Sequence, residues 1–270
     1  TTKDIIVYLD AVGNATILAA QIDNGSADTC SIVTRVLSKT VFACSNVGVN
    51  TVTLTVTDAS GNSSSKAATV TVTDNIAPAV GTQNLVIQLN ASGITTITAA
   101  QVNNGSTDNC SIVSYSLDKT LFTCSDTGVN TVTLTVTDAS GNSSSKTATV
   151  TVQDKIAPLI SAVASQSFCT NAAGTYTIPA LDATDNCSIA SVTYVITGAT
   201  NRTGTGLNAS GTFNVGVSTI TWTVTDAHGN SNTSTTTVTT SPLPAAVITV
   251  TNADAFCNKL ALTANAAADG

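Results

Sequence analysis

The sequence contains no glutamate and no methionine, and charged residues make up only 9% of its 270 positions. All 16 acidic residues are therefore aspartates. Helical bundles and coiled coils are built largely from Glu, Lys, Ala and Leu, so this composition excludes both. Thr, Ser, Asn and Gly supply an uncharged polar surface instead, while 42% of the residues are apolar and can form a core. We therefore expect an all-β chain.

Positive charge and long apolar runs are also scarce. Nine Lys and Arg residues against 16 acids give a net charge of −7, which excludes nucleic acid as a default partner because no basic surface can be assembled. No window approaches 18 consecutive apolar residues, so we expect no transmembrane segment. The chain begins without Met or a signal peptide, and we expect it to be a segment of a longer exported protein.

The cysteines have no zinc-binding pattern. No two of them form a CxxC pair, and the lone histidine, His228, has no second ligand type nearby in the sequence. Two pairs have the same spacing, each inside one repeat, and a third follows by elimination, so the predicted disulfides are Cys30–Cys44, Cys110–Cys124 and Cys169–Cys187. Cys257 is left to pair beyond Gly270 or not at all. Disulfides imply an oxidising compartment.

The sequence contains internal repeats. The segments 50–72 and 130–152 differ only at Ala67 and Thr147, and a divergent third copy keeps the same motifs. The predicted organisation is three modules at 1–77, 78–157 and 158–240. Residues 241–270 then form a linker and the truncated start of a fourth module. Near-identical tandem modules are typical of stalks and display regions rather than of enzymes.

Alternation of apolar and polar residues predicts strands within each module. In the segment 51–58, Val52, Leu54 and Val56 share one face and threonines share the other, which indicates a half-buried strand. Trp222 takes the place of Leu54 in the third copy and is predicted to be a core residue. The strands expected in the first module are 4–10, 14–22, 31–37, 40–44, 50–58 and 65–73. Their number and spacing predict tandem immunoglobulin-like Greek-key β-sandwich modules in a linear array.

Aspartates recur at three fixed places in the repeats, before the third strand, in the turn before the last strand, and in the linker. In an immunoglobulin-like sandwich these three places meet at one pole of the module. We therefore expect two groups of carboxylates, Asp74 with Asp108 and Asp138, and Asp154 with Asp185 and Asp226. Three converging carboxylates repel one another unless a cation is present, and hard oxygen ligands on flexible loops suit Ca²⁺ better than Zn²⁺ or Mg²⁺.

The alternative is that these aspartates are turn residues, because an Asp carboxylate accepts hydrogen bonds from nearby backbone NH groups. Turn formation does not explain the linker aspartates. At the pole of the first module, Asp28 and Asp58 could form a further site with Asp4 as the linker residue. The linker after the third module has no acid, and no ion is expected there.

His228 lies in a DAHGN turn where the other repeats have Ser60 and Ser140. A catalytic histidine replaced by serine in two of three copies would be unusual, so we expect an ordinary surface turn. No nucleotide-binding or nucleophile motif accompanies it. The chain is therefore predicted not to be an enzyme.

Three motifs resemble a known family. DNC, VGxxTVTxTVTDxxGN and D-x-I-A-P, spread over residues 1–240, are similar to the hyalin-repeat (HYR-like) modules of giant surface proteins. Their style most resembles Bacteroidetes cell-surface adhesins, including the SprB-like adhesins of gliding motility. This resemblance implies type IX secretion, display on the outer membrane, and adhesion to a substratum, polysaccharide or surface protein through other parts of the full-length chain.

Three functions fit the sequence. The first is a structural stalk of an extracellular adhesin whose module junctions are stiffened by Ca²⁺. The second is that the modules themselves bind glycan or protein, although aromatics, which usually form carbohydrate platforms, are only 4% of the chain. The third is a set of accessory repeats of an exported enzyme.

Overall fold

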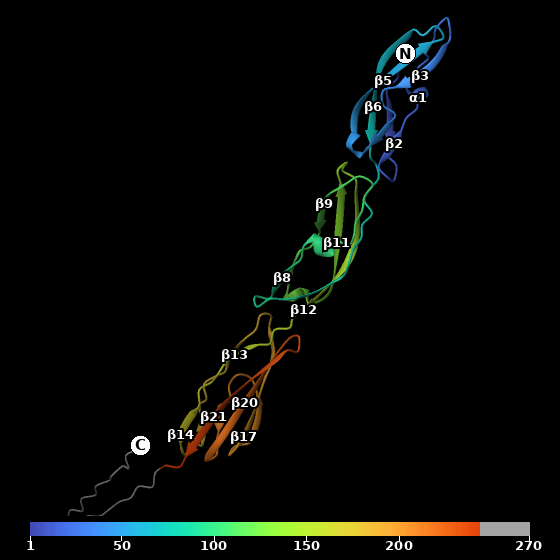
Figure 1. The fold of residues 1–270 in the computed structure, drawn as a ribbon. Coiled ribbons are helices and arrows are strands. Elements are labelled where there is room, and N and C mark those ends of the chain that lie inside the picture. The colour runs from blue at the N-terminus through green and yellow to red at the C-terminus, as the bar shows by residue number, and fades with distance from the viewer. Residues whose placement is uncertain (244–270) are drawn as a thin grey trace, which may run out of the picture. The chain divides into compact units, whose positions relative to one another are not determined.

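The computed structural model describes residues 1–243, which form an almost entirely β fold (Figure 1). The colours in Figure 1 show that each group of strands comes from one stretch of the chain. The described strands of any one sheet all belong to one repeat. The described residues divide into two compact units, one made of Thr1–Leu89 and Ile94–Gln153, the other of Asn90–Gly93 and residues 154–243.

The first module is a sandwich of a four-stranded and a two-stranded sheet. The larger sheet has the order β1-β6-β5-β3, in which β1 is parallel to β6, and the smaller pairs β2 with β4. A short helix, α1 (Ala19–Ile22), and a 3₁₀ turn, η1 (Cys44–Asn46), complete it. The strands are β1 (Ile5–Tyr8), β2 (Asn14–Thr16), β3 (Ile32–Leu37), β4 (Val41–Ala43), β5 (Gly48–Asp58) and β6 (Ser63–Thr73).

The second module repeats this arrangement. Its larger sheet has the order β7-β12-β11-β9 and its smaller sheet pairs β8 with β10. The strands are β7 (Leu85–Gln88), β8 (Ile94–Thr96), β9 (Ile112–Leu117), β10 (Leu121–Thr123), β11 (Gly128–Asp138) and β12 (Ser143–Gln153). The helical turns are α2 (Ala99–Val102) and η2 (Cys124–Asp126).

The third module keeps the central strands and adds an edge strand. Its main sheet has the order β14-β21-β20-β17-β18, with two small sheets, β13-β16 and β15-β19. The strands are β13 (Leu159–Ser161), β14 (Gln166–Cys169), β15 (Thr175–Tyr176), β16 (Asp182–Thr184), β17 (Ile189–Gly198), β18 (Arg202–Thr205), β19 (Gly211–Thr212), β20 (Gly216–Asp226) and β21 (Ser231–Ser241). The prediction of tandem all-β sandwich modules is confirmed.

The cores follow the predicted alternation. Val52 and Leu54 of β5 are buried against Phe42 of β4, which is fully buried between the two sheets of the first module. Burying side chains of this size removes the apolar surface whose exclusion from water drives folding. Trp222 of β20 is fully buried in the third module, as predicted.

One predicted strand is partly wrong. Residues 14–22 form strand β2 only as far as Thr16, and Ala19–Ile22 form α1 instead. The side chain of Gln21 accepts a hydrogen bond from the Leu18 backbone NH at 2.7 Å, which satisfies a donor at the start of the helix. Gln101 does the same for Thr98 at α2. Among the described residues, none of the helices is long and apolar enough to cross a membrane.

Acid is expected to destabilise the first module through Asp23. Hydrogen bonds from Ser26, together with Arg35, lower the pKa of Asp23 from 3.8 to about 2. A carboxyl whose folded pKa is lowered adds stability above the unfolded pKa and loses it as the pH falls through the folded one. Unfolding temperature, measured in chelator, should therefore drop between about pH 4 and pH 2. Asp23→Asn should flatten this profile, and identical profiles for the two proteins would contradict the assignment.

Candidate metal centres

Three carboxylates converge where the first module meets the second. Asp74 lies in the linker just after β6, Asp108 lies before β9, and Asp138 ends β11. One oxygen from each of these residues lies within 4.8 Å of the others. We call these three residues the first carboxylate group.

A β-bulge and a tight turn fix Asp138. The register between β11 and β9 shifts between Thr137 and Asp138, and bulges of this kind redirect a side chain at the end of a sheet. Its Oδ1 accepts hydrogen bonds from the backbone NH groups of Ser140 and Asn142, at 2.9 and 2.7 Å. Its Oδ2 accepts one from Asn142 Nδ2 at 2.7 Å. The turn therefore holds an almost fully buried carboxylate in place.

The linker aspartate is held by residues of the second module. Asp74 is only 4% exposed, and its Oδ1 accepts a hydrogen bond from Asn109 Nδ2 at 3.1 Å. Its Oδ2 accepts a longer one from Ser140 Oγ at 3.4 Å. Asn142 Nδ2 donates to the Asp74 carbonyl at 3.1 Å. The DNC and GN motifs thus orient the linker as well as their own loops.

Positive side chains do not neutralise this group. Among the described residues, the salt bridges of Lys and Arg go to other carboxylates, Asp23 and Asp126. Two like charges 4.8 Å apart at an effective dielectric constant of about 20 repel by roughly 3 kcal/mol, and the group contains three such pairs. A bound cation would turn this repulsion into attraction.

Two buried oxygens at the same place have no partner within the described part of the chain, Asp108 Oδ1 and Asn109 Oδ1. Asp108 Oδ2, by contrast, accepts a hydrogen bond from the Cys110 backbone NH at 2.9 Å. A buried acceptor left unpaired costs about 1–3 kcal/mol, and more when it is charged. Three carboxylates together with an unpaired amide oxygen form the donor set of a hard cation.

The second carboxylate group repeats this geometry in the second compact unit. Oxygens of Asp154, Asp185 and Asp226 also lie within 4.8 Å of one another. Asn186 Nδ2 donates to Asp154 Oδ1 at 3.1 Å, as Asn109 does to Asp74. Asp185 Oδ1 is buried and has no partner among the described residues. The sequence placed all six aspartates of the two groups in the combinations that the structure brings together.

The surroundings of Asp226 favour its ionised form. Burial opposes its ionisation, but hydrogen bonds from the Asn230 side chain and from the backbone NH groups of His228 and Asn230 outweigh burial and lower its pKa. The group therefore presents an ionised ligand at neutral pH.

His228 lies in an exposed turn, as predicted, but its side chain also contacts the second carboxylate group, a contact that was missed from the sequence. Its side chain is only 26% exposed, and Nδ1 lies 3.2 Å from Asp154 Oδ2. Ser140 occupies the equivalent place in the first group, where it contacts Asp74 Oδ2. His228 is thus part of the second group's surroundings. The other repeats have serine at this position, and both serine and histidine can reach the linker aspartate. The exchange of one for the other therefore does not reveal the contact from sequence.

Asp28 and Asp58, the sites predicted at the first module's own pole, are not joined there by a third acid among the described residues. Asp4 accepts a hydrogen bond from the Thr69 backbone NH at 2.7 Å instead of completing that group. After β21, Ser241 pairs with Cys169 as Thr73 pairs with Tyr8, so Pro242 takes the place of Asp74. Cys257 and the fourth module lie outside the described residues.

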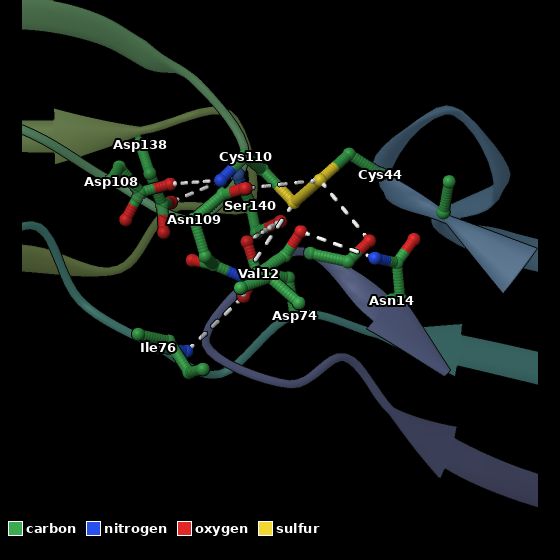
Figure 2. Close-up of a disulfide and its surroundings, with 12 residues drawn as sticks. Val12, Asn14, Cys44, Asp74, Ile76, Asp108, Asn109, Cys110, Asp138 and Ser140 are labelled. Atoms are coloured by element: carbon green, nitrogen blue, oxygen red, sulfur yellow. Dashed lines mark hydrogen bonds between the residues drawn. A yellow bond between two sulfur atoms is a disulfide. The ribbon is translucent and has the colours of Figure 1, made fainter. Parts of the chain in front are cut away.

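The predicted disulfide pairing is wrong. Cys44 is bonded to Cys110, with Cα atoms 5.4 Å apart, so the bond joins the first module to the second (Figure 2). Cys30 lies next to the end of the sheet where Ile32 pairs with Asp58, whereas η1 and Cys44 precede Gly48 at the other end of β5. Eleven residues of strand separate these ends by roughly 30 Å, far beyond the reach of a disulfide.

The other predicted pairs fail in the same way. Cys30 and Cys169 are free and exposed, so neither bonds Cys44 or Cys187. Cys124 and Cys187 are each disulfide-bonded, although not to the partners expected from spacing and elimination. Cys110 bonds a cysteine of the preceding module, so equal spacing of two cysteines within each repeat does not indicate that they form a disulfide.

Several residues around the disulfide could not be assigned a role from sequence. Figure 2 shows Cys44 approaching Cys110 beside Asn109, Asp108 and Asp138. Asn109 Nδ2 also donates to the Asp10 carbonyl at 3.3 Å, which ties the two modules together. Gly13 has a φ of 77°, and a Cβ there would stand 2.6 Å from both the Asn109 carbonyl oxygen and Cys44 Sγ. The recurrence of Asn in DNC and in GN was the available signal for this role.

Comparison with known proteins gives only distant similarities. No family model and no curated protein matches the chain. Among solved structures, it is similar to the protocadherin γB4 extracellular domain, with 17% identity over 86% of this chain and 44% of that one, at a TM-score of 0.33. Mouse cadherin-23 EC22–24 shows 15% identity, coverage of 90% and 96%, and a TM-score of 0.35. Drosophila N-cadherin EC1–3 shows 14% identity over 90% of this chain and 99% of that one, at a TM-score of 0.32.

The chain thus spans less than half the length of the protocadherin γB4 domain, and 62% of protocadherin γB7 EC1–4. What the carboxylate groups bind has to follow from their own geometry.

Proposed function

We propose that this chain is a structural, non-catalytic stalk region of an extracellular adhesive protein, and that Ca²⁺ bound by the two carboxylate groups stiffens its module junctions. The observation that carries the proposal is the first carboxylate group, in which a linker aspartate and two aspartates of the following module converge beside unpaired buried oxygens.

The choice of cation follows from the donor set. Asp74, Asp108 and Asp138 offer carboxylate oxygens, and Asn109 adds an amide oxygen. Thiolate and imidazole ligands, which favour zinc, are absent from the first group as described, and Cys110 beside it is consumed by the disulfide. Ca²⁺ accepts six to eight oxygens in flexible geometry and dehydrates more readily than Mg²⁺. A mixed set of loop oxygens therefore fits calcium best.

The chain's own residues explain how binding would stiffen a junction. Asp74 belongs to the linker, whereas Asp108 and Asp138 are fixed by turns of the second module. A cation shared by all three would tie the linker to that module. Without a cation, mutual repulsion would favour conformations in which Asp74 moves away. Asn109, which bonds both Asp74 and Asp10, would hold the first module in the same orientation.

The wider role rests on several features. Disulfides favour an oxidising, extracellular location. The resemblance to hyalin-type repeats leads us to propose, more specifically, a bacterial adhesin exported by the type IX route and displayed on the outer membrane. Gliding motility, with binding to substratum or polysaccharide elsewhere in the full-length protein, is the most specific form of this proposal.

Small-angle scattering tests the calcium effect. Chelator should broaden the distribution of module separations relative to Ca²⁺, because the linkers gain freedom. The change should be larger in the Cys44→Ser/Cys110→Ser variant, since the disulfide no longer restrains the first junction. Scattering curves that are identical in Ca²⁺ and in chelator for both proteins would show that these aspartates are turn residues only.

A further inference from the structure

The exposed pole of the first module is built like the covered pole of the second. Alignment of the first repeat with the second places Asp28, Cys30 and Asp58 on the residues that form the junction in the second module, Asp108, Cys110 and Asp138. The Cys30 backbone NH donates to Asp28 Oδ2 at 2.8 Å, as Cys110 does to Asp108 at 2.9 Å. The loop therefore has its junction geometry before any partner is in place.

The turn at Asp58 is also preformed. Asp58 Oδ1 accepts hydrogen bonds from the backbone NH groups of Ser60 and Asn62, both at 2.8 Å, and Oδ2 accepts one from Asn62 Nδ2 at 2.9 Å. Asp138 makes the corresponding three contacts in the second module, at 2.9, 2.7 and 2.7 Å. Hydrogen bonds from Asn62 lower the pKa of Asp58 and keep it charged.

What differs between the two poles is their cover. Asp138 and Val136 are buried in the second module, whereas Asp58 and Val56 are half-buried in the first. Asp28 and Cys30 are exposed, and the Cys30 thiol is free. A hollow remains at this pole, lined by Ala27, Asp28, Ile32, Val56, Asp58 and Asn62. At the second pole, Cys44 and the linker with Asp74 supply the cover.

We propose that this pole is a docking site for another module of the same repeat type, which supplies a cysteine in the position of Cys44 and a linker aspartate in the position of Asp74. Cys30 forms a disulfide with that cysteine. Asp28 and Asp58 form a third cation site with that aspartate. The cation part rests on the proposed function, whereas the disulfide part does not.

The covalent step is a thiol–disulfide exchange. The thiols of Cys30 and of the incoming cysteine lose two electrons and two protons and form one S–S bond. The oxidant is another disulfide, carried by a small molecule or an oxidoreductase, which is reduced to two thiols. Cys110 lies in the loop of the second module that corresponds to the Cys30 loop, and it bonds Cys44 of the preceding module. The incoming cysteine can therefore reach Cys30 from the same direction.

One difference between the repeats predicts that the proposed junction binds a cation less tightly than the first carboxylate group. Thr29 stands where the second module has Asn109, whose amide reaches both the Asp10 carbonyl and Asp74. A threonine hydroxyl is too short to bridge both groups and offers no amide oxygen to a cation. We therefore expect the disulfide at this pole to form normally and the cation to bind more weakly than at the first carboxylate group.

An extended chain tests the proposal. A second copy of residues 1–80, joined before Thr1, keeps the natural spacing of the repeats, and a second version uses a copy of residues 81–160. Free thiols are blocked, and the peptides are mapped without reduction. In both versions the Cys30 that follows the added copy should lose nearly all of its alkylation and appear joined to Cys44 or Cys124 of that copy. The matched control carries Ser at that added cysteine and should leave Cys30 alkylated.

Cys30 that remains fully alkylated in both versions, while the native Cys44–Cys110 bond is present, would overturn the proposal. Chelator separates this result from the calcium question, because the disulfide should form with or without it. Calorimetry should then find one additional, weaker Ca²⁺ site in the extended chain, strengthened by Thr29→Asn. If no Ca²⁺ binds anywhere but Cys30 is still bonded, the proposed function fails and the docking site stands.

Discussion

Asp74→Asn is expected to abolish Ca²⁺ binding at the first carboxylate group and leave the second intact. Calorimetric titration of the folded chain should show two sites in the wild type and one in the variant, with affinity at the lost site at least roughly 100-fold weaker. The reason is that Asp74 is buried and supplies one of only three charges there. Asparagine keeps the size and one oxygen, so the fold should remain intact.

Two controls sharpen this prediction. Asp154→Asn should remove the other site and leave the first, because it is the corresponding linker residue of the second group. Asp182→Asn makes the same change of charge at an exposed position outside both groups and should leave two sites. Two undiminished sites in Asp74→Asn would show that the linker carboxylate is not a ligand.

Removing the Cys44–Cys110 bond is expected to produce the largest loss of stability. The bond closes a loop with a sequence separation of 66, which in the chain-entropy model stabilises the folded state by about 4 kcal/mol. For two modules that unfold together, this corresponds to a fall in melting temperature of roughly 10 °C. Cys44→Ser/Cys110→Ser, studied by calorimetry without reductant, measures the effect of this one bond.

The exposed cysteines provide the matched control. Cys30→Ser and Cys169→Ser remove thiols that make no disulfide in the structure, so their melting temperatures should stay within about 1 °C of the wild type. An unchanged melting temperature in the double variant would mean that the modules unfold independently and that the bond does not constrain their unfolded chains.

Much of the fold followed from local pattern. The alternation of Val52 and Leu54 with threonines defines β5 because one face of that strand packs on a core and the other meets water. The sequence predicts a strand at residues 19–22 because their largely apolar character suits either a strand or a helix. The hydrogen bond from the Leu18 backbone NH to the Gln21 side chain is a local helix cap, which the alternation of apolar and polar residues does not reveal.

The aspartate groups could be predicted because their places follow from topology. Asp138 ends β11, and Asp74 follows β6 of the preceding module. Antiparallel pairing within each module and the direction of the linker therefore decide which pole each aspartate occupies. The same topology places Cys44 at the linker end of its module. The pairing was still missed because identical spacing in two repeats suggested a local loop, and spacing does not encode the length of the strand between the two ends.

The bond between Cys44 and Cys110 also redirects tension. A pull applied to the backbone before Cys44 and after Cys110 passes through the sulfur atoms and bypasses residues 45–109. The bypassed segment contains β5 and β6, the two longest strands of the first module, together with the linker that carries Asp74. Fully drawn out, those residues would add roughly 220 Å of contour length, at about 3.4 Å each. While the disulfide is intact, residues 45–109 cannot be extended by such a pull. Force along the backbone therefore does not separate the linker carboxylate from its partners.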